Sequence, residues 1–312
     1  MMSEISVAVG PALPEFGSWN WIGRGLLDSL RSSMRVSEFS DVTRPPVADI
    51  VVFLKFRPPV ETLCELKTRG AKLVFIPVDV YGSAAEIDKD HLSLKCFDLI
   101  LVHSRRLIRY LNVAVRVEFV DHPLKYVLSQ PKLIGTDGPM FWVGRSCNLG
   151  AVSDWFNRSE MDHDLWILTE TDGCFPTAEQ LGFIQPDRIR VAEWNEERHL
   201  NWLSQAKLTV DVKANDFRSR HKPPAKAFDF LASGLPVLTN RGSSTDLEMQ
   251  FRGLRPLYTD AWSFHDSAFE QHNRQRNAVV IRNAASAEHV WTHVRQYLTE
   301  LLEQRQVARS VE

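Results

Sequence analysis

A lysine and an aspartate stand three positions apart in a segment that is expected to fold as a short helix. The segment is residues 222–240, KPPAKAFDFLASGLPVLTN, and the pair is Lys226 and Asp229. Two prolines suit the helix start, where a backbone N–H is not needed, and Gly234 suits the position after its last turn. The spacing places both charged groups on one helix face. The lysine and the first-turn amides would attract a phosphate, and the aspartate would accept hydrogen bonds from ribose hydroxyls.

A basic stretch directly precedes this helix. Residues 215–222, NDFRSRHK, carry the candidate phosphate contacts Arg218, Arg220, His221 and Lys222. Cations beside a helix start would compensate a diphosphate, each charge-assisted hydrogen bond contributing about 1.5 to 3 kcal/mol. Both features also fit surface structure without a ligand. In that alternative the stretch is a solvated loop, and the Lys226–Asp229 pair is an exposed ion pair contributing about 0.3 to 0.5 kcal/mol.

Short β-branched and aliphatic runs alternate with segments of helical character along the chain. In the first half the expected strands are residues 5–9, 49–53, 72–77, 97–103 and 115–120, and the expected helices are 21–32, 60–69 and 105–111. In the second half the expected strands are 140–143, 165–169, 189–192, 208–212 and 235–239, and the expected helices are 151–157, 177–182, 196–205 and 225–233. This alternation predicts the α/β class, with two doubly wound, Rossmann-like domains.

The length of the chain fits two domains. At 312 residues it exceeds the size at which single hydrophobic cores stop growing, roughly 250 to 300 residues. The turn-rich stretch 129–139, SQPKLIGTDGP, interrupts the alternation and is the expected linker. We therefore expect an N-terminal domain over residues 1–130 and a C-terminal domain over 139–285. Residues 286–312 are expected to contribute an amphipathic helix that packs either on the C-terminal domain or back on the N-terminal one.

Residues 226–237, KAFDFLASGLPV, resemble the donor-site signature of GT-B glycosyltransferases, especially the branch grouped with family 4 (glycosyl transferases group 1). In that signature a lysine, an acid three residues later and a small-Gly-x-Pro-Val run recur together. By position, Lys226 would contact the donor phosphates and Asp229 the ribose. Many members have two glutamates that bracket this helix. His221 stands at the position of the first, so this chain departs from the family at the contact which that glutamate makes to the donor sugar.

The resemblance assigns roles to two further segments. Residues 141–145, FWVGR, resemble the strand and turn that open the second domain of these enzymes, where an arginine often reaches the diphosphate. Arg145 is therefore a further phosphate candidate. Gly17 and Ser18 occupy the place of a glycine-containing turn that approaches donor or acceptor.

Three polar residues of the first half are candidates for catalysis. Asp79 and His103 follow expected strands, and His122 lies near the expected domain junction. If the resemblance holds, these side chains would face the cleft that separates the two domains of a GT-B protein. Each also fits a hydrogen-bonded structural residue, and no catalytic base follows from the sequence.

Composition argues against several functions and sites. The net charge of −2 gives no basis for nonspecific attraction to nucleic acid. Two Asp-x-Asp patterns, at 88–90 and 162–164, lie in polar stretches, and no metal site is expected. The chain shows neither a leader-like N terminus nor an apolar run of about 18 residues, so we expect a cytoplasmic protein without a transmembrane segment. The cysteines lack the spacing of a zinc or redox motif and are expected to be reduced, mostly buried thiols; they are Cys64, Cys96, Cys147 and Cys174.

The resemblance implies a hexosyltransferase-type enzyme of glycan biosynthesis. It would move a sugar from a nucleoside diphosphate sugar to a hydroxyl group of a glycan, lipid-linked or small-molecule acceptor. The reaction would use no metal or other cofactor and would retain the anomeric configuration. One alternative is a sugar-nucleotide epimerase of the same fold, which the lack of an acid cluster disfavours. The other is a noncatalytic two-domain protein that binds a nucleotide or a sugar.

Overall fold

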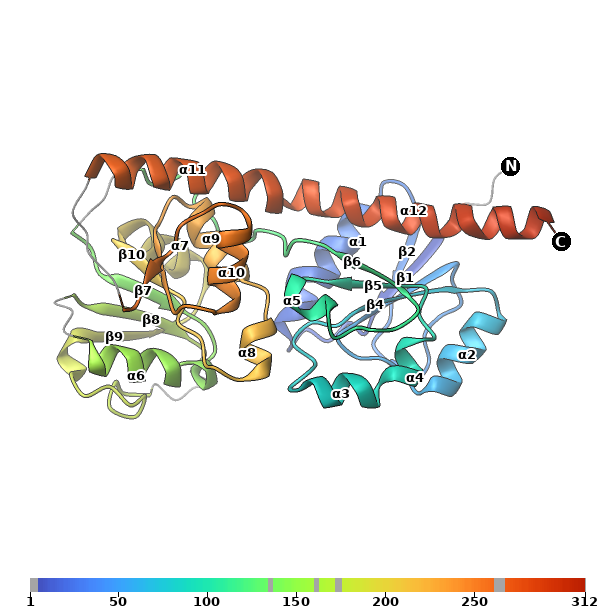
Figure 1. The fold of residues 1–312 in the computed structure, drawn as a ribbon, viewed down its shortest axis with the longest axis horizontal. Helices are drawn as coiled ribbons and strands as arrows, with labels where there is room; N and C mark the ends of the chain where they lie inside the picture. The colour runs from blue at the N-terminus through green and yellow to red at the C-terminus, as the bar shows by residue number, and fades with distance from the viewer. Residues whose placement is uncertain (1–4, 134–136, 160–162, 172–175, 261–266, 312) are drawn as a thin grey trace. The chain divides into compact units, whose positions relative to one another are not determined.

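The protein is described by a computed structural model that covers residues 5–133, 137–159, 163–171, 176–260 and 267–311 (Figure 1). The chain divides into two compact units. Unit 1 consists of residues 1–123 and 286–312, and unit 2 of residues 124–285. Cys174 and Asp162, named above, lie outside the described residues. The expectation of mostly buried thiols was wrong for the described cysteines, because Cys64 and Cys147 are exposed and Cys96 is only partly buried.

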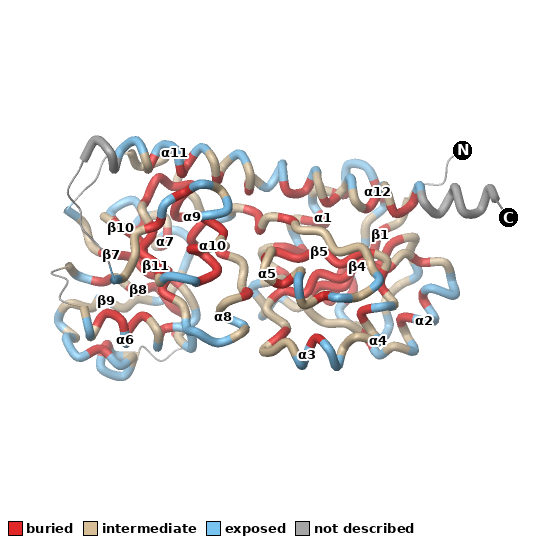
Figure 2. The backbone as a smooth tube through the Cα atoms, in the orientation of Figure 1, coloured by how far each residue is buried: buried red, intermediate tan, exposed pale blue. Residues whose placement is uncertain are grey.

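Unit 1 contains a parallel sheet with the strand order β2-β1-β3-β4-β5-β6. The strands are β1 (Ser6–Gly10), β2 (Arg35–Glu38), β3 (Ile50–Leu54), β4 (Lys72–Ile76), β5 (Leu99–Val102) and β6 (Arg116–Phe119). Its helices are η1 (a π-helical turn, Trp19–Gly23), α1 (Arg24–Leu30), α2 (Val60–Thr68), α3 (Ala84–Lys89), α4 (His91–Leu94), α5 (Arg105–Ile108) and α12 (Ala287–Val311). Every residue of β3, IVVFL, is buried, as expected of a central parallel strand covered on both faces. Its neighbours β4 and β5 are buried along most of their length (Figure 2).

Unit 2 contains a second parallel sheet, with the order β12-β11-β10-β7-β8-β9. The strands are β7 (Met140–Val143), β8 (Leu165–Thr169), β9 (Ile189–Glu193), β10 (Leu208–Val210), β11 (Val237–Thr239) and β12 (Leu257–Tyr258). Its helices are η2 (Ser146–Asn148), α6 (Gly150–Arg158), η3 (Pro186–Arg188), α7 (Glu196–Gln205), α8 (Phe217–His221), α9 (Ala225–Ala232), α10 (Ser244–Phe251) and α11 (Ser267–Ala285). Counted along the chain, this is the strand order of a dinucleotide-binding fold, and the α/β prediction is confirmed.

Some local predictions were wrong. Residues 177–182, expected as a helix, form turns. The basic stretch expected as a loop contains helix α8, because the side chain of Asp216 accepts a hydrogen bond from the Ser219 amide and caps its start. In the turn-rich stretch 129–139, whose role as a linker stays a prediction, the Lys132 amide donates to the Ser233 carbonyl at 2.8 Å. The elements that were not predicted are strands β2 and β12 and helices α3, α4, α10 and α11.

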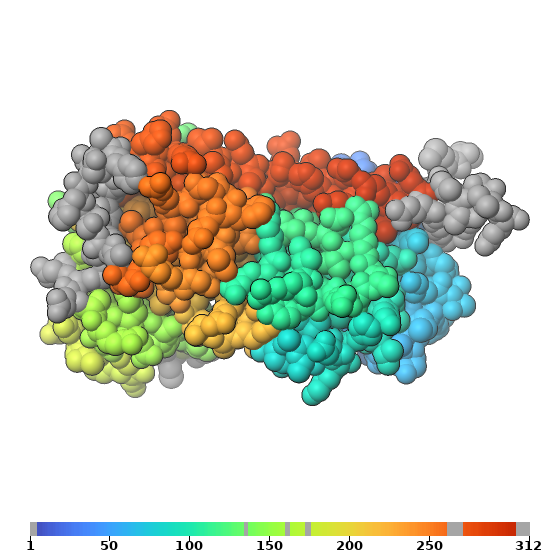
Figure 3. Space-filling view, viewed as in Figure 1, coloured from blue at the N-terminus to red at the C-terminus, as the bar shows by residue number. Residues whose placement is uncertain are grey.

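Helix α12 completes the core of unit 1. Trp291, Val294 and Leu298 of α12 are buried in the same cluster as Ile22 and Leu26. In the space-filling view the described part of α12 (red) lies directly on unit 1 (Figure 3). Arg116 of β6 also pairs with Glu300 at 2.8 Å.

Gly25 determines how closely α12 approaches α1. A Cβ atom at this position would lie 2.8 Å from the indole ring of Trp291. We therefore expect Gly25→Val to destabilise the protein by about 1 to 3 kcal/mol through overpacking. Gly17→Val is the control, because a Cβ at Gly17 meets nothing within 4 Å. Urea denaturation measures both, and equal stability of the two variants would contradict this packing.

Candidate functional site

The strand order of unit 2 indicates where a ligand would bind. The chain runs outward in one direction from β7 through β8 and β9, then crosses back to β10 on the other side of β7. In open parallel sheets ligands bind outside the carboxyl ends of the strands at such a reversal. In unit 2 this place is the edge formed by the ends of β7 and β10.

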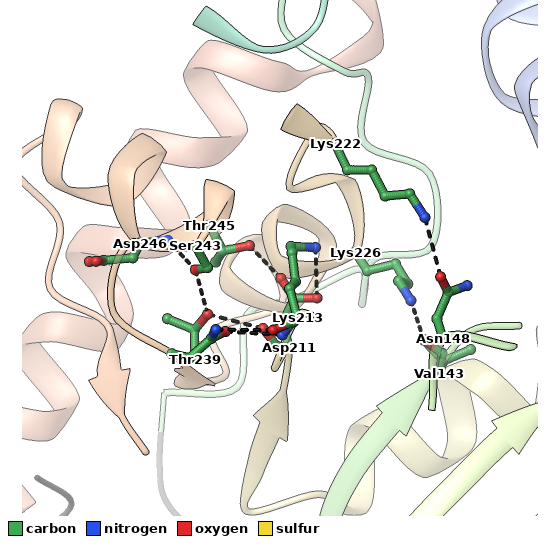
Figure 4. Close-up of polar contacts among 11 residues, drawn as sticks. Val143, Asn148, Asp211, Lys213, Lys222, Lys226, Thr239, Ser243, Thr245 and Asp246 are labelled. Atoms are coloured by element: carbon green, nitrogen blue, oxygen red, sulfur yellow. Dashed lines mark hydrogen bonds and ion pairs between the residues drawn. The ribbon is translucent and has the colours of Figure 1, made fainter. Parts of the chain in front are cut away.

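Lys226 is held at this edge. Its ammonium group donates to the carbonyl of Val143, the last residue of β7, at 2.6 Å (Figure 4). The same group lies 5.0 Å from the ring centroid of Trp142. No side chain among the described residues caps the start of α9. Lys226 is the second residue of α9, so its ammonium group and the first-turn amides lie at the same end of the helix. This is the geometry expected for an anion site.

Gly144 makes room for this lysine. A Cβ atom there would lie 2.4 Å from the Lys226 ammonium nitrogen. The glycine of the FWVGR segment thus permits the close approach between the turn after β7 and α9.

The predicted end of α9 is also confirmed, since Gly234 has a φ of +78° and its backbone faces that of Lys132.

Lys213 and Asp211 belong to the same edge and were missed by sequence reasoning. Asp211 follows β10 and is buried; one carboxylate oxygen lies 3.1 Å from the Lys213 ammonium, and the other accepts a hydrogen bond from the Thr245 hydroxyl. Burial opposes ionisation of Asp211, but the charges of Lys213 and Lys226 and the Thr245 hydrogen bond outweigh it and lower its pKa. The group is therefore an ionised acid held between two cations.

The start of α10 is tied to the same network. The Ser243 hydroxyl accepts from the Asp246 amide at 3.1 Å and bonds the Thr239 hydroxyl at 2.9 Å. Asn240 bridges the ends of β10 and β11, because its side chain accepts from the Lys213 amide and donates to the Lys213 carbonyl, both at 3.0 Å. In Figure 4 the side chains of Thr239 and Ser243 lie beside those of Asp211 and Lys213. In the sequence, Lys213 directly follows the expected strand 208–212, which is the signal that could have pointed to it.

The candidates before α9 lie close by but differ in their contacts. Lys222 donates to the Asn148 side chain at 3.2 Å, which joins it to the turn after β7. Arg220 donates to the Asn215 side chain at 2.7 Å. The His221 ring is buried and stacks on Phe217 with ring centroids 4.0 Å apart. Arg218 lies on the same short helix, α8.

Arg145 is an exposed member of the edge. Its side chain is 72% exposed and lies 3.3 Å from Glu170, which also accepts from the Ser146 amide. An exposed pair of this kind is weak and breaks readily. Arg145 therefore remains a candidate for a diphosphate contact.

Asp229, the residue expected to contact the ribose, is buried and already bonded to the backbone. Asp229 is 1% exposed, and its two carboxylate oxygens accept backbone amides of Lys125 and Tyr126 at 3.0 and 3.1 Å. Burial raises its pKa to about 7, against the opposing effect of those two amides and the Lys125 charge. The i, i+3 spacing from Lys226 was read correctly, but the aspartate faces the protein interior, where it binds the segment after Pro123.

The catalytic candidates of unit 1 gather at the carboxyl ends of its strands. His103 follows β5 and is buried; its Nδ1 lies 2.9 Å from the Val120 carbonyl and therefore carries the proton. Nε2 is then an acceptor, and it has no hydrogen-bond partner among the described residues. Burial lowers the pKa of His103, which keeps the ring neutral, although the Val120 and Asp121 backbone and the nearby Asp79 charge act in the opposite direction.

Asp79 and His122 flank this histidine. Asp79 follows β4, adopts a φ of +52° that is uncommon for a non-glycine residue, and has a buried Oδ1 without a partner among the described residues. The rings of His103 and His122 lie 5.4 Å apart, and His122 also packs on Trp21. The structure thus brings Asp79, His103 and His122 together.

Gly17 and Ser18 lie directly before η1, the helical turn whose Trp21 packs on His122. Gly17 is exposed, and the Ser18 side chain makes no capping hydrogen bond. Within the described part of the chain, no group of three or more metal-ligating side chains is found. None of the helices in that part is both long enough and apolar enough to cross a bilayer.

Comparison with known proteins identifies the fold. No protein-family model matches the chain. No curated protein matches it either. Among solved structures, the chain resembles a glycosyltransferase from Rickettsia africae (TM-score 0.66, 10% identity, 96% of this chain and 99% of that chain covered).

Two further structures match over similar lengths. They are a sucrose-phosphate synthase from Thermosynechococcus elongatus (TM-score 0.64, 13% identity, 96% and 99% covered) and HepE from Anabaena in complex with UDP-glucose (TM-score 0.63, 11% identity, 95% and 100% covered). At such low identity these similarities establish the fold alone. The chain has the GT-B fold, as the sequence predicted.

The buried Asp211 allows a test of this network. We expect Asp211→Asn to destabilise the protein by about 3 kcal/mol, because it leaves the Lys213 ammonium, whose side chain is 12% exposed, without its carboxylate. Asp260→Asn is the control, since Asp260 forms an exposed pair with Arg241 and should cost less than about 1 kcal/mol.

The pH dependence of the same variant follows from the lowered pKa of Asp211. A carboxyl group whose pKa is lowered on folding contributes stability above its unfolded pKa, about 3.9, and loses it as the pH falls through the folded value. The difference between wild type and Asp211→Asn should therefore be full at pH 7 and shrink below about pH 4. Urea denaturation of both proteins at pH 7 and below about pH 4 measures this. A difference in unfolding free energy that does not change between these pH values would contradict an ionised Asp211.

Proposed function

We propose that this chain is a glycosyltransferase that transfers a sugar from a nucleoside diphosphate sugar to an acceptor hydroxyl. The observation that carries the proposal is the placement of Lys226, with Lys213 and Lys222, at the carboxyl edge of β7 and β10 in a GT-B fold. Three cations from three elements at the reversal point of a parallel sheet suit the two charges of a diphosphate.

The chemistry at this edge is stabilisation of the leaving group. As the bond from the sugar to the diphosphate breaks, negative charge grows on the phosphate oxygens and the sugar acquires oxocarbenium character. Lys226 and the first-turn amides of α9 would oppose that charge from fixed positions, which is a large contribution to catalysis in a preorganised site. Lys213 and Arg145 would add to it. This arrangement needs no metal, and the family 4 resemblance implies retention of configuration and a hexosyl donor.

Unit 1 would supply the second set of contacts. His103 Nε2 and Asp79 Oδ1 are buried acceptors without partners among the described residues, and sugar hydroxyls are donors of the matching kind. We assign these two atoms to hydroxyl groups of the reacting sugars. The neutral state of His103, favoured by its burial, keeps Nε2 able to accept.

Thermal unfolding with separate nucleotides tests the donor site. A ligand at 100 times its dissociation constant stabilises the folded state by about 2.7 kcal/mol. We expect a selective rise in Tm with one of UDP, GDP, ADP, dTDP or CMP, and UDP is tested first because HepE was solved with UDP-glucose. Hydrolysis of the matching nucleotide sugar in the absence of acceptor then separates a transferase from a noncatalytic binding protein. No rise with any nucleotide would contradict the proposal.

Lys226→Ala in the same assay tests the phosphate contact. The variant should lose about 10- to 100-fold in affinity for the nucleoside diphosphate, because a charge-assisted hydrogen bond is removed, and little for the nucleoside. Lys95→Ala, at an exposed lysine of unit 1, should bind both ligands as the wild type does. An equal loss for diphosphate and nucleoside would assign Lys226 to another part of the ligand.

His103→Asn tests the contacts of unit 1. Asparagine retains a donor for the Val120 carbonyl and removes Nε2, so we expect turnover to fall about tenfold or more while affinity for the nucleoside diphosphate stays within about twofold. His289→Asn, at an exposed position of α12, is the control. Steady-state transfer rates and calorimetric affinities measure the two quantities, and unchanged turnover would remove His103 from the reaction.

A further inference from the structure

Helix α9 is bonded along one side to the segment by which the chain enters unit 2. We call residues 124–128 the connecting segment. The amides of Lys125 and Tyr126 donate to Asp229, and the Leu128 amide donates to the Ser233 hydroxyl at 3.0 Å. Asp229 lies on α9, and Ser233 follows the last residue of that helix one turn later. Consecutive hydrogen bonds therefore hold α9 and the connecting segment together.

Helix α11 fixes the same segment from its other end. The guanidinium group of Arg282 donates to the Leu128 carbonyl at 2.6 Å and to the Ala232 carbonyl of α9 at 2.7 Å. The Leu124 amide donates to the Ala285 carbonyl, the last residue of unit 2, at 2.8 Å. The points where the chain enters and leaves unit 2 are thus adjacent, and α9 is bonded to one of them.

Tyr126 provides a second link to the cation site. Its ring lies 5.3 Å from the ring of His199 on α7 and 5.4 Å from that of Trp194. His199 is buried, and its pKa is lowered to about 4, first by burial and then by the charge of Lys226. Tyr126 therefore contacts a side chain that lies within the electrostatic range of the Lys226 ammonium.

We propose that Asp229 is a positioning residue that couples the donor site on α9 to the connecting segment, and that it is not a ligand of the ribose. Asp229 and Lys226 lie one turn apart on a single rigid helix, and their side chains are committed to different partners, the connecting segment and the end of β7. A diphosphate that binds Lys226 contacts a helix that Asp229 fixes in place. By thermodynamic reciprocity, loosening the connecting segment lowers the affinity for the diphosphate, and binding of the diphosphate orders the segment.

Hydrogen exchange on the 312-residue protein, without any nucleotide, tests whether Asp229 fixes the connecting segment. At pH 8 the Asp229 carboxylate is ionised, because this pH lies above its pKa of about 7. In Asp229→Asn the amides of Lys125 and Tyr126 should exchange on the order of tenfold faster, since the side-chain amide cannot accept from both. Ser233→Ala is the matched control on the same helix and should release the Leu128 amide alone. Unchanged exchange at residues 125 and 126 in Asp229→Asn would overturn the proposal.

Nucleotide affinity tests the coupling to the donor site, which rests on the proposed function. Asp229→Asn should lower the affinity for the nucleoside diphosphate about 3- to 30-fold and the affinity for its deoxyribose analogue by the same factor. The substitution should have much less effect on affinity when Lys226 is already alanine. The bound diphosphate should slow exchange at residues 125 and 126 in the wild type. A loss confined to the ribonucleotide would make Asp229 a ribose ligand and overturn the proposal, and so would additive effects of the two substitutions.

The two proposals fail in different ways. If the wild type binds no nucleotide, the proposed function and the coupling to a donor are both overturned, while the exchange rates still decide whether Asp229 fixes the connecting segment. If the wild type binds a diphosphate and Asp229→Asn changes neither affinity nor exchange, the function stands and the positioning role fails.

Discussion

The hydrogen bond from the Lys226 ammonium to the Val143 carbonyl fixes a cation at the carboxyl edge of the second sheet, and much of unit 2 serves to make that bond possible. Gly144 leaves the space, the prolines before α9 start the helix at the right place, and Asp229 and Ser233 attach the other side of α9 to the connecting segment. A lysine on a short helix is ordinarily mobile, with about 2 kcal/mol of side-chain entropy to lose. Here the helix and its surroundings limit where the ammonium can lie before any ligand arrives.

The carboxyl edge of the second sheet carries a buried acid as well as its lysines. Asp211 is buried between Lys213 and Lys226, and its remaining oxygen is satisfied by Thr245. A buried acid in such a place lowers the cost of keeping two ammonium groups close together without a ligand. The same acid holds Lys213 in a defined position through an ion pair, while Asn240 fixes the backbone of that residue. The edge is therefore organised by side chains that never need to touch the ligand themselves.

The sequence could predict those features that depend on neighbours along the chain. Alternating apolar runs gave the two parallel sheets, the prolines and Gly234 gave the limits of α9, and the spacing of Lys226 and Asp229 placed them one turn apart. It could not show which partner each side chain faces, because Asp229 meets Lys125 and Tyr126 only after the chain has folded over more than a hundred residues. Asp211 and Lys213 were missed for the same reason, since Thr245 and Asn240 join them from a later strand and helix. Helix α8 was missed because its cap, Asp216, stands in a stretch whose cations suggested a solvated loop.

The interrupted course of unit 1 affects how the protein can be made on a ribosome. Trp291, Val294 and Leu298 of α12 belong to the core of unit 1, yet they are synthesised after all of unit 2. Unit 2 is one continuous stretch whose two ends are joined by the bond between Leu124 and Ala285. The core of unit 1 can therefore be completed only after unit 2 has been synthesised, in contrast to the usual N-terminal-first course. Until α12 has been synthesised, the apolar side chains of η1 and α1 that pack on it lack this part of their core.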